Sequence, residues 1–89
     1  MNTDTRSIKV VHIAKINGEG NLKAFIDVEY AGLIIKKCSV INGKRGLFVS
    51  MPRKVDNMGR WMDTVVPVSD DLREAFNDVI LEAYEKEIA

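Results

Sequence analysis

The spacing of apolar residues changes once along this chain, near Ser69, and this change restricts the fold more than any other feature. Before Ser69 the clearest pattern lies in residues 22–30, where apolar side chains occupy every second position. A period of two is typical of a β-strand with one face in water. From Leu72 onward, apolar residues recur at the spacing of a helix with about 100° per residue. The sequence therefore predicts strands first and a single C-terminal helix after them.

Turn residues divide the first part of the chain into short strands. Glycine and asparagine mark turns at 17–21, 42–43 and 56–59, and Ala31-Gly32 forms a tight turn. Pro52 ends the fourth strand, because proline cannot donate a ladder hydrogen bond. The expected strands are residues 7–16, 22–30, 33–41, 47–51 and 60–66. Since connections this short favour a meander, we expect an α+β fold: an antiparallel β-sheet of four to five strands, followed by one C-terminal α-helix packed on the sheet.

The predicted helix begins after Ser69, whose side chain can cap it, and acids follow in the first turn, where the helix dipole favours them. One apolar stripe can cover the dry face of the sheet; it consists of Leu72, Ala75, Phe76, Val79, Ile80 and Ala83. A second apolar sector, formed by Leu81, Tyr84 and Ile88, indicates that the helix also has a neighbour on its other side. A partner subunit would explain this sector, and so would a curled sheet edge or the N-terminal strand. We expect a homodimer with these three residues as interface candidates.

Length and composition fit one domain that spans residues 1–89. The chain is 46% hydrophobic and 29% charged, which is ordinary for a globular protein. Residues 1–5 are polar, so they are expected to be flexible and lack the apolar core of a signal peptide. No apolar run approaches the roughly 20 residues that a membrane span needs. We therefore expect a cytoplasmic protein that does not contact a membrane.

The chain contains few groups that could support catalysis or bind metal. It has one histidine, His12, and one cysteine, Cys38, which is too few for a usual zinc site or an internal disulfide. The carboxylates at the start of the helix lack the spacing of an EF-hand, and the turn at 17–21 lacks a phosphate-loop pattern. We expect no catalytic residue, metal, cofactor or small-molecule substrate, and thus no enzyme.

Charge is segregated along the chain although the formal net charge is zero. Residues 36–60 carry seven Lys or Arg and one Asp, whereas residues 61–89 carry two Lys or Arg and eight Asp or Glu. Because surface potential depends on local charge, the middle segment could attract a polyanion. The candidate nucleic-acid-binding residues are Lys44, Arg45, Arg53, Lys54, Arg60 and Arg73. Lysines that guard sheet edges against aggregation would give a similar pattern, so this alternative stays open.

Several motifs together resemble the bacterial stage V sporulation protein G family. The matching stretches are "NGEGNLKAFIDV" and "NGKRGLFVSMP", followed by Gly59, Asp63, Pro67, Arg73, Val79, Leu81 and Tyr84. The resemblance implies a small dimeric α/β protein of the bacterial cytoplasm that binds DNA, and in some members RNA. It also implies a role in gene expression linked to sporulation, septation and cell division. Carried over by position, it implies nucleic-acid contact at Arg53, Lys54 and Arg73.

Two functional hypotheses follow from these patterns. In the first, a dimer binds a nucleic-acid duplex through residues 36–60 and regulates gene expression. Binding of single strands would need exposed aromatic side chains, for which Trp61 and Phe25 are the candidates, although each is more often a core residue. In the second, the acidic helix and the second apolar sector dock another protein of the division or sporulation apparatus, without direct contact to nucleic acid.

Overall fold

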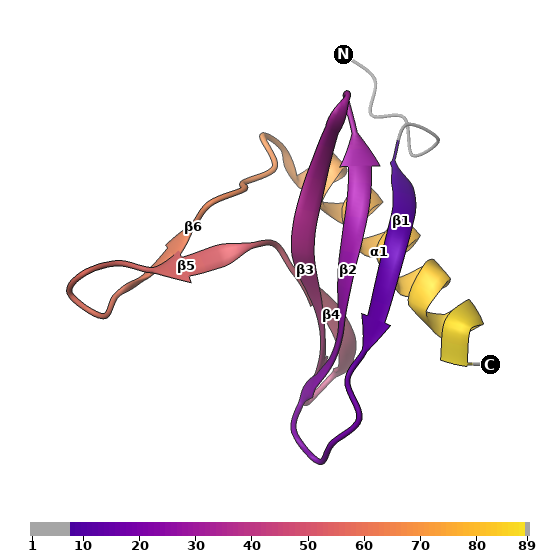
Figure 1. Cartoon of the computed structure of the whole chain (residues 1–89). Coiled ribbons are helices and arrows are strands. Elements are labelled where there is room, and N and C mark those ends of the chain that lie inside the picture. The colour runs from indigo at the N-terminus through magenta and orange to yellow at the C-terminus, as the bar shows by residue number, and fades with distance from the viewer. Residues whose placement is uncertain (1–7, 89) are drawn as a thin grey trace.

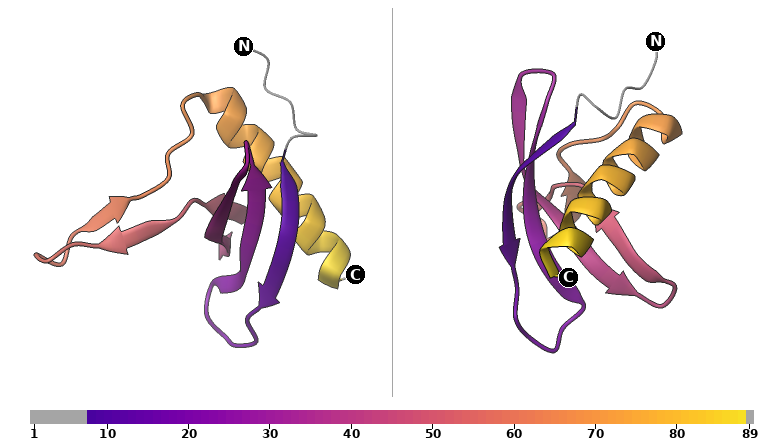
Figure 2. Two further views of the ribbon diagram at one scale, coloured as in Figure 1. Left: turned by 45° about the horizontal axis from the view of Figure 1, so that its top comes forward. Right: turned by 90° about the vertical axis from the view of Figure 1, so that its right-hand side faces the viewer.

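A four-stranded antiparallel sheet and one helix form the body of the protein (Figure 1). The computed structural model describes residues 8–88, so the expectation for residues 1–5 lies outside the described residues. The strands follow one another as a meander in the order β1-β2-β3-β4; they are β1 Lys9–Lys15, β2 Leu22–Tyr30, β3 Leu33–Gly43 and β4 Gly46–Ser50. Helix α1, Asp70–Ile88, lies across one face of this sheet (Figure 2). The predicted α+β fold is thereby confirmed.

The core lies between this helix and the sheet, as the period-two pattern of β2 predicts. Ala24, Ile26 and Val28 alternate along β2 and are all fully buried. They meet buried residues from β3 and from the helix; these are Cys38, Val40, Ala75, Phe76, Ile80 and Tyr84. Because neighbouring strand residues point to opposite faces, Phe25 and Ser39 lie on the other face of the sheet. We call that face, which the helix does not cover, the outer face.

The helix starts where the sequence predicts it. Ser69 Oγ accepts a hydrogen bond from the Leu72 N–H at 3.1 Å, and the Ser69 carbonyl accepts one from the Arg73 N–H at 3.1 Å. Ser69 is thus the N-cap. In the second apolar sector, Tyr84 is buried in the core of the single chain and Leu81 is partly buried against that core, while Ile88 is 53% exposed. The chain itself therefore covers much of this sector. Within the described residues, no helix is both long and apolar enough to cross a bilayer.

One predicted turn was wrong by two residues. Ala31 and Gly32 do form the β2–β3 turn, with φ values of 53° and 80° that are typical of a type I′ turn. At the next hairpin, however, β3 continues through Asn42 and Gly43, and the turn is formed by Lys44 and Arg45. The physical reason is that Gly46, with φ 115°, supplies the backbone conformation that favours glycine.

The predicted fifth strand exists but does not join the sheet. Strand β6, Trp61–Asp63, pairs instead with a strand that the sequence analysis missed, β5, Arg53–Val55. Together they form a separate antiparallel ribbon, here called the arm (residues 53–63), which projects from the body in Figure 1. On the free edge of β4, the Val49 N–H donates to Asn77 Oδ1 of the helix at 3.2 Å.

Candidate nucleic-acid interface

A β-bulge in β3 sets the direction of two lysines on the outer face. Ile26 pairs with Cys38 and Val28 pairs with Ile35, so that one residue of β2 opposes Lys36 and Lys37 of β3. That residue is Asp27, whose Oδ1 accepts the Lys37 N–H at 3.0 Å. Lys37 has φ 66°, which lies in the left-handed region. Since the bulge breaks the alternation of the strand, both lysines line the same hollow.

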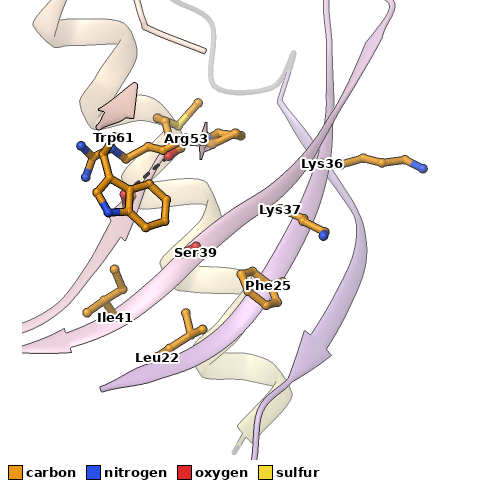
Figure 3. A pocket seen from close by; sticks show the side chains of 11 residues that line it. Leu22, Phe25, Lys36, Lys37, Ser39, Ile41, Arg53 and Trp61 are labelled. Carbon is orange, nitrogen blue, oxygen red and sulfur yellow. Dashed lines mark hydrogen bonds between the residues drawn. The ribbon is translucent and has the colours of Figure 1, made fainter. Parts of the chain in front are cut away.

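This hollow lies on the outer face, between the sheet and the base of the arm (Figure 3). Its volume is about 630 Å³. Its apolar and hydroxyl lining comes from three strands of the sheet, from the link to the arm and from the arm: Leu22, Phe25, Ser39, Ile41, Ser50, Met51, Pro52 and Trp61. Three cations, Lys36, Lys37 and Arg53, complete the lining, and none of the described residues that line it is an acid. We call this feature the outer hollow.

Arg53 holds Trp61 in place at the arm side of the outer hollow. The Arg53 Nε lies 3.0 Å from Asp63 Oδ1 on the neighbouring strand, and its guanidinium carbon lies 5.6 Å from the centroid of the Trp61 ring. This is a cation–π contact combined with an ion pair. Trp61 is nevertheless 63% exposed. An aromatic side chain therefore lies against a cation while much of it faces water.

Arg60, at the tip of the arm, is bound by the carboxylate of Asp56. The Asp56 Oδ1 accepts the N–H groups of Met58 at 2.8 Å and of Arg60 at 2.9 Å, and Oδ2 accepts Arg60 Nε at 2.9 Å. The Arg60 N–H is the main reason why the pKa of Asp56 lies below its usual value; partial burial opposes this shift, and the other two bonds add to it. Arg53 and Arg60 thus each have an acid beside them, and they present less net charge than the sequence count suggests.

The remaining candidates are spread over the molecule. Lys44 and Arg45 occupy the β3–β4 turn, at the other end of the five-residue strand β4 from the arm, which corresponds to about 17 Å. Lys54 pairs with Met62 in the arm, and Arg73 lies on the helix beside Asn77 and the end of β4. Of the six predicted residues, the structure brings only Arg53 into the outer hollow.

The sequence analysis did not select Lys36 and Lys37 as site residues. Their signal was present, because two successive lysines interrupt the alternation of a strand that is otherwise half apolar. Trp61 and Phe25 were named as aromatic candidates and do line the outer hollow. Within residues 8–88 the structure contains no group of three potential metal ligands.

The acidic side chains of the helix lie away from the outer hollow, whereas Asp27 and Asp63 contact two of its lining residues, Lys37 and Arg53. The helix covers the opposite face of the sheet (Figure 2), and its exposed acids are on the side that faces solvent; they include Glu74, Asp78, Glu82 and Glu85. The sheet therefore stands between the cations of the outer hollow and the carboxylates of the helix.

Comparison with known proteins now decides the family. The SpoVG family model matches residues 6–86 of the chain. This protein belongs to the SpoVG family. A relative from Symbiobacterium thermophilum, named "Putative septation protein SpoVG", is 36% identical over 76 residues, which are 84% of this chain and 54% of that protein. Relatives of the same name from Caldanaerobacter subterraneus and Clostridium perfringens are both 35% identical, over 85% and 90% of this chain and the same shares of their own lengths.

The resemblance drawn from "GLFVSMP" and the residues that follow it is thus confirmed. Membership in the SpoVG family connects the chain with septation and sporulation, as the names of the family and of its members indicate. None of these names denotes a class of enzyme.

Proposed function

We propose that this SpoVG-family protein binds nucleic acid through its outer face and arm, and thereby regulates gene expression linked to sporulation or septation. The observation that carries the proposal is the outer hollow, whose described lining includes three cations and no acid. The acids of the helix lie on the far side of the sheet, so they would not repel phosphates that approach the outer face. DNA and RNA both offer the required phosphates.

Phosphate contacts of this kind would set affinity more than sequence preference. Lys36 and Lys37 are mobile point charges at the bulge, and Lys54 adds a cation on the arm. Lys44 and Arg45, about 17 Å away along β4, could contact a more distant phosphate of the same ligand. Neutralising these contacts releases counterions from the nucleic acid, so binding should weaken steeply as salt is added.

The salt dependence of binding provides the test. Fluorescence polarisation of labelled DNA and RNA would be measured across a salt series for the parent chain and for the double variant Lys36→Ala/Lys37→Ala. The double variant should lower the slope of log affinity against log salt by about 1.8 for a duplex, since each phosphate contact contributes about 0.9. The matched control is Lys9→Ala/Lys15→Ala, which removes two exposed lysines from β1. Equal slopes for the two double variants would contradict the proposed site.

A second candidate function is that of a protein-interaction module that docks through the C-terminal end of the helix. We propose that the chain also forms a homodimer through this surface, where Ile88 is 53% exposed and Leu81 is partly buried. Sedimentation of Leu81→Lys and Ile88→Lys variants, against Val68→Lys as a control at another exposed apolar position, would test self-association. Unchanged mass for the helix variants would exclude this end of the helix as the dimer contact.

A further inference from the structure

We infer that the outer hollow accepts an unpaired base of a single-stranded nucleic acid, which stacks on Trp61 while its phosphate is held by Lys36 and Lys37. This inference rests on the proposed function and narrows it from nucleic acid in general to single strands. It follows from three observations: an exposed aromatic platform, the shape of the hollow, and the distribution of charge around it.

Trp61 lies outside the core of the described chain. The arm is a separate two-stranded ribbon, and the core cluster between sheet and helix does not include this residue. Its side chain is 63% exposed and carries Arg53 over the ring at 5.6 Å. A cation–π contact favours one position of the indole, which lowers the entropic cost of stacking a base on it. Single-strand-binding proteins combine base–aromatic stacking of this kind with a positively charged groove.

The shape of the outer hollow also suits a single flexible strand. Its volume of about 630 Å³ lies within the roughly 300–1,000 Å³ of pockets that bury small organic groups. Phe25, on the floor, is half-buried and offers a second aromatic surface. In a duplex the faces of the bases are covered by their neighbours, and only the base edges reach the grooves. A base must therefore be unpaired and unstacked before its face can meet Trp61.

Cations and aromatic side chains line the same hollow. Figure 3 shows Trp61 on one side of the outer hollow and Lys36 and Lys37 on the other; the Lys36 side chain extends away from Trp61, and Lys37 lies nearer to Phe25. Asp27, the carboxylate of the bulge, accepts the backbone N–H of Lys37 at 3.0 Å and is not among the lining residues. The lysine side of the hollow is thus complementary to an anion, and the tryptophan side to an aromatic ring.

The chain has one tryptophan, so its fluorescence reports on this site alone. Oligothymidylate added to the parent protein should quench Trp61, whereas a duplex of equal length should not. In polarisation assays, Trp61→Ala should weaken binding of oligothymidylate about 5- to 150-fold and leave duplex affinity unchanged. Trp61→Phe should retain most of the affinity, because a phenyl ring still stacks. Met62→Ala, on the next residue of the arm and itself 46% exposed, is the matched control and should bind as the parent does.

Each other outcome overturns the inference in a distinguishable way. If oligothymidylate and duplex both bind but Trp61→Ala binds both as the parent does, single-strand stacking is wrong and the proposed function stands. If neither ligand binds, the proposed function fails as well. Quenching by thymidine monophosphate at the same concentration as by the oligonucleotide would assign the hollow to a free nucleotide. A blue shift of Trp61 emission with protein concentration alone would assign it to a second copy of the chain. Far-UV circular dichroism of every variant verifies that it is folded.

Discussion

Lys37 combines a strained backbone with a charge that we propose to contact phosphate, and substitutions at this position separate the two effects. Its φ of 66° costs a residue with a Cβ about 1–2 kcal/mol relative to the right-handed regions. Glycine avoids this cost but loses about 0.5–1 kcal/mol because it is more flexible in the unfolded chain. The bond from the Lys37 N–H to Asp27 Oδ1 at 3.0 Å comes from the backbone, so it survives any substitution except proline. Lys37→Gly should therefore be more stable than Lys37→Ala by about 0.7 kcal/mol, the difference between these two ranges.

Urea denaturation measures this difference directly. With a denaturant slope of about 2 kcal/mol/M, the midpoint of Lys37→Gly should lie about 0.3–0.4 M above that of Lys37→Ala. Both variants lose the same cation, so both should lower the salt slope of oligothymidylate binding by the same amount, about 0.7. The reasoning is refuted if Lys37→Ala is as stable as Lys37→Gly, because Lys37 would then not be held in the left-handed conformation. Different salt slopes for the two variants would show that the backbone, and not the charge, governs binding.

Three further predictions concern the scaffold. Ala31→Asn should stabilise the protein by about 0.5 kcal/mol, since asparagine tolerates the positive φ of 53° in the type I′ turn; a melting temperature raised by about 2–4 °C would agree, and a lower one would contradict the turn type. Asn77→Ala should cost about 1 kcal/mol and speed hydrogen exchange at Val49, whose N–H loses its acceptor at 3.2 Å; Asn77→Asp keeps an acceptor oxygen, and equal losses in both variants would exclude this bond as the cause. Burial raises the pKa of Cys38 from 9.0 to about 11, so the folded chain keeps this proton when the unfolded chain has lost it. Stability relative to Cys38→Ala should thus be constant below about pH 9 and fall towards pH 11 by up to about 1.4 kcal/mol per pH unit; no decline in urea midpoints over this range would refute the shift.

The sheet and the helix could be predicted because their signals are local. The alternation in residues 22–30 selects one buried face, and a shift by a single residue would expose all of it. Ser69 caps the helix by accepting a hydrogen bond from the N–H of Leu72, only three residues further along the chain. Such features depend on neighbours in the sequence, which are visible without coordinates.

The candidate site could be predicted only in part, because its parts come from distant segments. The sequence located the basic segment and named Trp61 and Phe25, but it treated Arg53 and Arg60 as free cations. Asp63 forms an ion pair with Arg53 at 3.0 Å, because the two residues are cross-strand partners in the arm. Asp56 forms an ion pair with Arg60 at 2.9 Å across the loop at the tip of the arm. Neither ion pair could be assigned before the pairing of β5 with β6 was known.

The order of residues alone determined that this chain forms a meander followed by a capped helix, because hydrophobic period, turn residues and capping act over a few positions. It also determined the separation of basic and acidic segments. Tertiary structure decided that the fifth strand leaves the sheet and pairs with β5 in the arm. It likewise decided that a bulge opposite Asp27 brings Lys36 and Lys37 into the lining of the same hollow as Trp61 of the arm. These outcomes depend on which backbone groups are already hydrogen-bonded when the segments meet, and a linear pattern does not contain that information.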